Sequence, residues 1–423
     1  MSADKPPARR AFLTAGLTGA GAAVAGAAAG YGYRDTRPVP ASTVALENAQ
    51  AGLLPAVPFH GKYQAGILPQ SQQQTAVISF NVTADGRDEL TSLFQTLTAR
   101  ARFLTAGGTP PQAGIGGPPP DSGVLGPTVT PNGLTVTVGV GSTLFDDRYG
   151  LASQLPRKLY PMQPFPNDNL DSAQCGGDLI VQLSAGNTDT VMHALRDIAK
   201  HTRGGMQAVW RIDGFASPPR PSGTVPRNML GFMDGISNPD TTSQAEMDSL
   251  VWIQPGSKDE PAWTANGSYF VVRLIRMLIE FWDRVDIGEQ EGMIGRRRDT
   301  GYPLDATSIF ATPDYAQDPT GDIIPLTSHM RIANPRTPQS ADSRILRRGY
   351  NYDRGIDTVG NLDVGLVFTC FQQDVQRQFE TVQTRLIDEP LVDYISPFGG
   401  GYFLALPGVV NSADYYGRAL LTA

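Results

Sequence analysis

The N-terminal half of the chain alternates between strand-like and helix-like patterns of apolar residues. Ala76–Val82 (AVISFNV) has the composition and length of a strand. In Arg87–Leu104, apolar residues recur every three or four positions, which predicts an amphipathic helix. A Gly- and Pro-rich loop is expected over residues 105–133. The same patterns then predict a strand, a strand, a helix and a strand at Leu134–Val140, Asp178–Ala185, Thr188–Lys200 and Gln207–Phe215.

This order of elements is typical of a ferredoxin-like unit, and it recurs further along the chain. Ala216–Thr224 (ASPPRPSGT) predicts a linker. We therefore expect an α+β protein with two ferredoxin-like halves whose antiparallel sheets face each other. The predicted domains cover residues 76–222 and 223–423 and follow an irregular segment at residues 31–75. In the second domain, strands are expected at Ser268–Ile275, Val364–Cys370 and Gly401–Leu406, and helices at Phe281–Glu291 and Gln373–Leu386.

Residues 1–30 have a different character from the rest of the chain. The pair Arg9-Arg10 precedes an uncharged run, rich in Ala and Gly, from Ala11 to Gly30. This pattern resembles a twin-arginine export signal with small-residue cleavage sites near its end. A membrane anchor or a disordered tail is the alternative, although the run is only mildly apolar for a permanent span. We expect export by the twin-arginine machinery to the periplasm or the outside, without stable membrane insertion after cleavage.

Composition narrows the classes of function. The 423 residues include 34 Lys and Arg against 41 Asp and Glu, a net charge of −7. This balance disfavours a general nucleic-acid binder, which needs a basic face. The two cysteines, Cys175 and Cys370, exclude a disulfide scaffold, an iron–sulfur protein and an all-cysteine zinc site, and neither begins a C-x-x-C-H haem attachment motif. Four histidines leave few candidates for imidazole chemistry.

Three short motifs carry candidate chemistry, and each also has an ordinary structural interpretation. Gly231–Gly235 (GFMDG) is compatible with a simple Gly-Asp turn. His329 lies within Thr327–Arg336 (TSHMRIANPR), where an axial haem ligand would find guanidinium partners for the haem propionates, but a core or loop histidine is the common alternative. Arg344–Tyr350 (RILRRGY) also fits a solvated basic loop.

Together these motifs resemble those of dye-decolorising peroxidases. GFMDGISNP, SHMRIANPR and ILRRGYNYDRG follow one another in the order of the family, and the resemblance extends over residues 55–410. It is strongest to an exported branch that resembles a haem-handling peroxidase of bacterial ferrous-iron uptake. The chain departs from the family at Tyr63, where His is frequent, and this departure leaves the haem motifs untouched. Further matching segments are Pro58–Ile67 (PFHGKYQAGI), Gly288–Arg296 (GEQEGMIGR) and Phe398–Phe403 (FGGGYF).

The resemblance implies a fold of the dimeric α+β barrel class, with one non-covalent haem b per chain held mainly by the C-terminal half. His329 would be the axial ligand of the haem iron. Asp234 and Arg347 would lie on the opposite, distal face as the acid–base residue and the catalytic arginine. Four further residues would contact the haem: Arg331 and Asn238 at its edge and propionates, and Leu366 and Phe368 as an apolar distal wall.

An Asp–Arg pair suits the cleavage of hydrogen peroxide. A base must take the proton from one oxygen and return it to the leaving oxygen, while a cation stabilises the departing hydroxide. A nearby arginine favours the ionised carboxylate, which stays charged down to about pH 4, so activity is expected to lean acidic. A reducing substrate must then supply electrons. Bulky donors would pass them through aromatic side chains, among which the sequence singles out no relay.

Two other functions stay open at this point. The protein could be a haem-handling component of iron acquisition, in which haem is cargo and its iron is recovered. It could also be a ferredoxin-like binding domain without haem. The electron donor, the oligomeric state and the carboxylate that would hydrogen-bond to His329 are not specified by the sequence.

Overall fold

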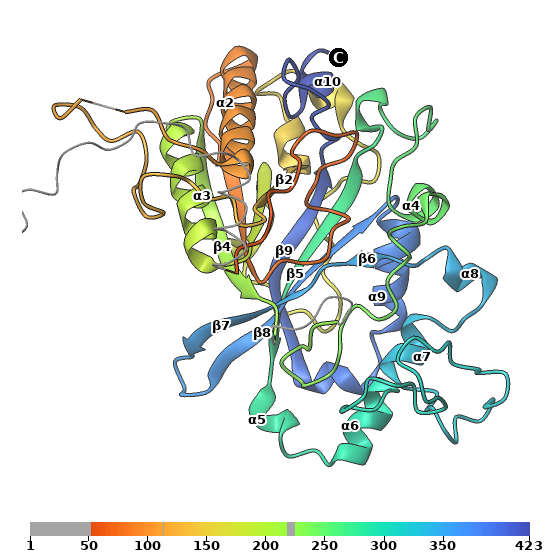
Figure 1. Ribbon diagram of the computed structural model, residues 1–423. Coiled ribbons are helices and arrows are strands. Elements are labelled where there is room, and N and C mark those ends of the chain that lie inside the picture. Colours follow the sequence, from red (N-terminus) through yellow and green to blue (C-terminus); the bar gives the residue numbers. More distant parts are fainter. Residues whose placement is uncertain (1–51, 113, 218–224) are drawn as a thin grey trace, which may run out of the picture. The chain divides into compact units, whose positions relative to one another are not determined.

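The computed structural model describes residues 52–112, 114–217 and 225–423. The predicted signal peptide at residues 1–30, the part of the irregular segment up to residue 51 and residues 218–224 of the predicted linker lie outside the described residues. Gly52–Ala423 forms one compact unit, in which one topology occurs twice (Figure 1).

The first half confirms the predicted ferredoxin-like order. Its antiparallel strands lie in the order β2-β3-β1-β4, and α2 and α3 pack against them and against each other. In β1, Ile78 and Phe80 face the helices, whereas Val77 faces the opposite side of the sheet. The elements are β1 (Gln74–Val82), α2 (Arg87–Ala106), β2 (Thr135–Gly141), β3 (Leu179–Ala185), α3 (Thr188–His201) and β4 (Met206–Phe215).

The second half has the equivalent strand order β9-β5-β8-β7. Its second crossover is a π-helix, Gln376–Glu380, that continues into α9 (Thr381–Arg385). Its first crossover is a long insertion, residues 278–345, in place of a single helix. The strands are β5 (Ser268–Met277), β7 (Tyr350–Ile356), β8 (Leu362–Gln372) and β9 (Ile395–Ala405), with the short β6 (Leu346–Arg347) also paired to β8.

The insertion corrects one prediction from the sequence. The predicted helix Phe281–Glu291 is wrong, because α5 (Ile279–Trp282) ends before α6 (Ile287–Ile294) begins. Asp286 caps α6 by accepting a hydrogen bond from the Glu289 backbone N–H at 3.0 Å, a position that aspartate favours over a helix interior. The insertion also contains α7 (His329–Ala333) and α8 (Pro338–Ala341), while α4 (Gln244–Leu250) precedes β5 and α10 (Arg418–Leu421) ends the chain.

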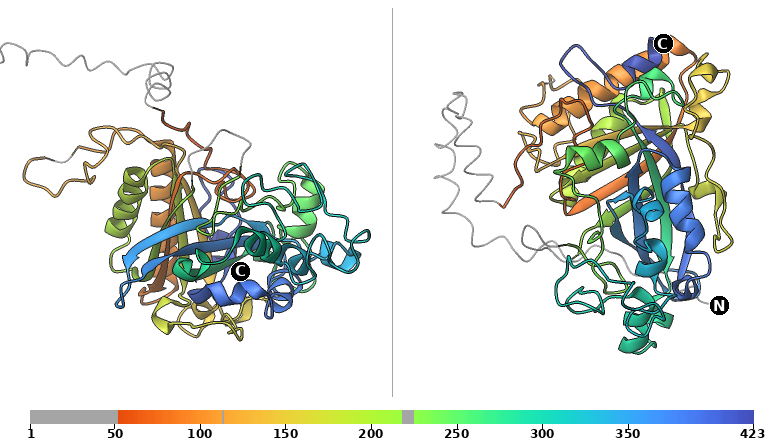
Figure 2. Two further views of the ribbon diagram at one scale, coloured as in Figure 1. Left: turned by 90° about the horizontal axis from the view of Figure 1, so that it is seen from below. Right: turned by 90° about the vertical axis from the view of Figure 1, so that its right-hand side faces the viewer.

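The two four-stranded sets are joined at both edges into a closed ring. β2 pairs with β9 and β4 pairs with β7, so the ring runs β5-β9-β2-β3-β1-β4-β7-β8 and returns to β5. The ring encloses a core that includes Trp210, Phe270 and Phe371. Figure 2 shows the strands with α2 and α3 on one side and α9 on another. This arrangement confirms the predicted α+β fold and leaves the outer face of β5 and β8 to be covered by α9 and the insertion.

In residues 52–112, 114–217 and 225–423, no helix combines the length and the apolar character that a bilayer crossing requires.

Candidate active site

A cavity of about 260 Å³ lies between the insertion, α9 and the outer face of β5 and β8. Five of the seven predicted site residues line it: His329, Asp234, Arg347, Leu366 and Phe368. Leu366 and Phe368 are two positions apart on β8, so both side chains point from the same face of the sheet. The fold thus brings together residues from three separate motifs on the walls of one cavity.

His329 is held by a carboxylate that the sequence analysis did not identify. Its Nδ1 lies 2.7 Å from Oε2 of Glu389, a residue that is 3% exposed. Because a carboxylate accepts the hydrogen bond, Nδ1 carries the proton, and in the neutral imidazole Nε2 keeps its lone pair. Burial is the largest single influence on the pKa of His329 and lowers it, but the charge and the hydrogen bond of Glu389, with the charge of Asp234, together raise this pKa above its ordinary value. About a third of the His329 side chain remains accessible, and His329 lines the cavity.

Asp234 and Arg347 form an ion pair within the same cavity. Nη1 of Arg347 lies 3.1 Å from Oδ1 of Asp234, and both side chains are mostly buried. Two positions next to the ion pair require glycine for structural reasons. Gly235 has a φ of 93°, in the left-handed region that glycine adopts without strain. A Cβ on Gly349 would lie 3.2 Å from Oδ2 of Asp234, so this glycine allows the carboxylate to approach the backbone.

Asn238 and Arg331 do not line this cavity. The Asn238 side chain accepts a hydrogen bond from the Arg347 backbone N–H at 3.1 Å and donates one to the Arg347 carbonyl at 2.8 Å. Asn238 therefore positions the backbone of Arg347. Arg331 donates to the carbonyls of Asp318 and Ile324 at 2.7 and 2.8 Å, and its guanidinium lies over the ring of Tyr315. These contacts fix the fold of the insertion before α7.

Two other arginines line the cavity and lack a carboxylate within ion-pairing distance among the described residues. Arg296 donates to the carbonyls of Gly301 and Ile309 at 2.8 and 3.1 Å. Burial, together with the nearby charge of Arg336, lowers the pKa of Arg296 to about 10. Arg336 is exposed at the cavity wall. The two arginines are the last residues of the segments Gly288–Arg296 and Thr327–Arg336, and they are better placed for anionic groups in this cavity than Arg331.

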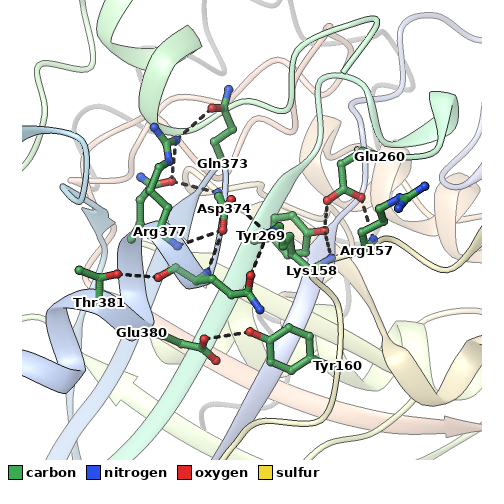
Figure 3. Close-up of polar contacts among 12 residues, drawn as sticks. Arg157, Lys158, Tyr160, Glu260, Tyr269, Gln373, Asp374, Arg377, Glu380 and Thr381 are labelled. Carbon is green, nitrogen blue, oxygen red and sulfur yellow. Dashed lines mark hydrogen bonds and ion pairs between the residues drawn. The ribbon is translucent and has the colours of Figure 1, made fainter. Parts of the chain in front are cut away.

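A polar cluster on the far side of the π-helix connects it to the segment around residue 160 (Figure 3). Tyr160 donates a hydrogen bond to Oε2 of Glu380 at 2.9 Å, and Tyr269 donates one to Oε1 of Glu260 at 2.6 Å. The neighbour of Glu380 in the π-helix, Phe379, lines the cavity instead. The π-helix therefore presents adjacent residues to the cavity and to a half-buried tyrosine, and π-helical turns are frequent at functional sites.

Aromatic rings form a continuous series from the cavity to Tyr160. Phe368 and Phe379 both line the cavity, with ring centroids 6.1 Å apart. Phe379 is 5.8 Å from the buried Tyr402, which is 5.9 Å from the half-buried Tyr160. None of these spacings was visible from the sequence, because the four residues come from four separate segments.

The chain matches two family models along most of its described length. Residues 64–216 match the Dyp-type peroxidase, N-terminal model and residues 225–410 match the Dyp-type peroxidase, C-terminal model. Deferrochelatase from Escherichia coli K12 is 48% identical over 368 residues, which cover 86% of this chain and 87% of the relative. Deferrochelatase from Shigella flexneri has the same identity and coverage.

Solved structures agree with these matches. Ferric DtpA from Streptomyces lividans has a TM-score of 0.78 and 33% identity, and the match covers 87% of this chain and 98% of that one. The DyP-type peroxidase from Cellulomonas bogoriensis has a TM-score of 0.77 and 32% identity, with coverages of 87% and 99%.

Proposed function

This chain belongs to the Dyp-type peroxidase family, oxidoreductases that act on peroxide, and from that premise we propose that it is an exported haem b peroxidase. It reduces hydrogen peroxide and oxidises dyes, phenolics or other one-electron donors. One observation carries this proposal. His329, which is hydrogen-bonded to a carboxylate, lines the same cavity as the ion pair of Asp234 and Arg347.

The residues of the cavity fit one non-covalently bound haem b. The free Nε2 of His329 would hold the haem iron, and a carboxylate on the other ring nitrogen is the usual support for a metal-bound histidine. Leu366 and Phe368 provide apolar contacts. Arg296 and Arg336 offer guanidinium groups to the propionates. Haem iron supplies the redox chemistry that converts hydrogen peroxide to water at the expense of two one-electron donors.

Asp234 and Arg347 have different roles: Asp234 transfers a proton, and Arg347 stabilises a developing negative charge. The Asp234 carboxylate accepts the proton of the near peroxide oxygen and delivers it to the leaving oxygen. Arg347 stabilises the negative charge that develops on that leaving oxygen. The ion pair holds the two side chains in position in the cavity. Asn238 fixes the Arg347 backbone through two hydrogen bonds.

Electrons from a donor too large for the cavity would enter through aromatic side chains. The series Phe368, Phe379, Tyr402 and Tyr160 supports such a route, because successive ring centroids are about 6 Å apart. Glu380 lies beside Tyr160 and accepts its phenolic hydrogen bond, so it is placed to take the proton when that phenol loses an electron.

The proposal is tested on the purified mature protein. We expect a Soret band with one haem b per chain, and steady turnover of a dye that requires both hydrogen peroxide and the haem-loaded protein. A protein that shows a Soret band but no peroxide-dependent turnover would contradict the peroxidase assignment. Absence of any Soret band after growth with haem would contradict haem binding itself.

The relatives named deferrochelatase favour a second function, recovery of iron from haem. In that case haem would be cargo, and the same cavity would hold it. The discriminating measurement is the fate of the porphyrin: iron removal produces metal-free porphyrin, which fluoresces, and consumes the bound haem. Peroxidase turnover leaves the haem content unchanged over many cycles.

A further inference from the structure

A second cavity, of about 270 Å³, opens on the other side of the Asp234–Arg347 pair. Both of these residues line it, together with Asn238 and Arg348. Arg348 directly follows the catalytic arginine in the chain, but the proposed peroxidase mechanism does not use it. Its backbone N–H donates to the Thr369 carbonyl of β8 at 2.8 Å, which fixes its place at the end of β6 (Figure 1).

Arg348 is a buried cation for which the described residues offer no counter-charge. Its side chain belongs to a residue that is 6% exposed, and no carboxylate lies within ion-pairing distance of it among the described residues. Nη1 donates to the Pro69 carbonyl, while Nε is buried without a hydrogen-bond partner. Burial lowers the pKa of the Arg348 guanidinium, and the only opposing influence comes from the neighbouring Tyr350 hydroxyl.

Three arginines are buried among the described residues. Arg273 forms an ion pair with Asp168, whereas Arg296 and Arg348 have no described carboxylate within ion-pairing distance. Arg296 donates to two backbone carbonyls, but Arg348 donates to one and has a buried Nε without a partner. A buried charge without a partner is strongly unfavourable, because the protein does not replace the water that the charge has lost. The described residues supply no such partner at Arg348, whereas the adjoining cavity can admit a molecule that does.

We propose that this second cavity binds a small oxyanion, of the carboxylate or phosphate class, on the guanidinium of Arg348. Oxyanions suit a guanidinium because two oxygens can accept two parallel N–H bonds, an arrangement that a halide cannot form. Ser71 and Thr241 also line the cavity and carry hydroxyl groups that can donate to further oxygens. The bound anion would lie in a cavity shared with Asp234 and Arg347, apart from the haem side.

The test measures anion binding on the haem-loaded protein by thermal unfolding and by the Soret band together. The probes are acetate, phosphate and chloride, each titrated at constant ionic strength. An affinity of about millimolar lies within the limit that the few heavy atoms of acetate set. At 100 mM we expect acetate and phosphate to raise Tm by roughly 1–4 °C in a saturable manner, with chloride inactive and the Soret band unchanged. An unchanged Soret band separates this site from anions that bind at the iron.

Two variants locate the site. Arg348→Met removes the guanidinium and should abolish the oxyanion-dependent rise in Tm. Arg354→Met removes a half-exposed arginine of β7, paired with Asp363, and should retain the rise. Equal stabilisation of both variants by acetate and phosphate, or no stabilisation of the parent, would overturn the proposal.

If Arg348→Met does not fold, crystals of the parent protein soaked in selenate give the answer instead. An anomalous selenium peak within hydrogen-bond distance of Arg348 supports the site, and selenate bound only elsewhere contradicts it. Neither result depends on turnover, so the anion site can fail while the peroxidase assignment stands, and the reverse also holds.

Discussion

Nδ1 of His329 and Oε2 of Glu389 lie 2.7 Å apart, although 60 positions separate the two residues in the chain. His329 begins α7 in the insertion, whereas Glu389 comes after α9, directly before the 3₁₀ helix Pro390–Tyr394. The hydrogen bond therefore connects the two crossovers of the C-terminal half at the wall of the cavity. It also fixes the ring nitrogen that is left for a ligand.

Replacing His329 by Ala is expected to remove most of the haem or to leave it weakly bound with an altered spectrum. The reason is that His329 is the histidine that lines the cavity and is oriented by a carboxylate. Haem content per chain and the Soret band are the measurements. His60→Ala is the matched control, because His60 is exposed and pairs with Arg102 away from the cavity. Unchanged haem in the His329 variant would rule out this ligand.

Replacing Glu389 by Gln tests the orienting carboxylate separately from the ligand. The amide keeps the shape of the side chain but loses the charge, and loss of such a partner typically weakens metal-site affinity about 10–100-fold. We expect faster haem loss to a haem-accepting protein and a raised reduction potential, with the histidine still bound. Glu380→Gln removes a carboxylate outside the cavity and should leave both quantities unchanged. Identical behaviour of the two variants would mean that Glu389 does not act through His329.

Asp234 and Arg347 are expected to act at one step, the reaction with peroxide. Loss of an acid–base group typically costs about 10²–10⁴ in rate, and loss of an oriented charge about 10²–10³. Because the two side chains form one ion pair, the double variant should lose less than the product of the single losses. Stopped-flow mixing of Asp234→Asn, Arg347→Leu and the double variant with peroxide, followed at the Soret band, measures these rates.

Asp240→Asn provides the control for that series, because Asp240 is exposed on the same loop and does not line either cavity. If both single variants react with peroxide at the parent rate, other residues must carry out the peroxide chemistry.

The regular elements were predictable because their apolar periodicity matches their burial. Arg87–Leu104 was predicted as a helix and α2 covers it, since residues such as Leu90 and Leu97 are fully buried on one face. β7 was missed for the opposite reason. After Tyr350, Asn351 and Tyr352, its remaining residues are exposed, so no alternation marks the strand.

Only the site residues that lie in short sequence motifs could be predicted. His329, Asp234 and Arg347 stand in short recognisable segments, and the fold brings all three to one cavity. Glu389 has no local signature, because its role arises from the chain returning after α9 to meet His329. The roles of the arginines could not be ranked from sequence either, because a guanidinium in a motif can bind backbone carbonyls, as Arg331 does, as readily as a ligand.

Export is expected to depend on the arginine pair Arg9-Arg10 itself. The twin-arginine route recognises the two guanidinium groups, whereas a general secretory signal needs only positive charge before the apolar run. Replacing both residues by Lys keeps the charge and should block export, so that the protein accumulates inside the cell. Cell fractionation with a pulse label measures this. Export of the Lys-Lys form at the parent rate would contradict the twin-arginine prediction.

Tyr160 is expected to limit the oxidation of bulky donors but not the reaction with peroxide. Tyr160→Phe keeps the ring that packs against Tyr402 and removes the hydroxyl that donates to Glu380. Without that hydroxyl the residue can no longer lose an electron and a proton together, so turnover of a large dye should fall several-fold. The stopped-flow rate with peroxide should not change, because Tyr160 does not line the cavity.

The control is Tyr415→Phe. Tyr415 is a half-buried tyrosine outside the series, so this substitution should leave dye turnover unchanged. Equal dye turnover in the parent and both variants would exclude Tyr160 as the entry point, and a slower peroxide reaction in Tyr160→Phe would show that the substitution disturbs the cavity instead.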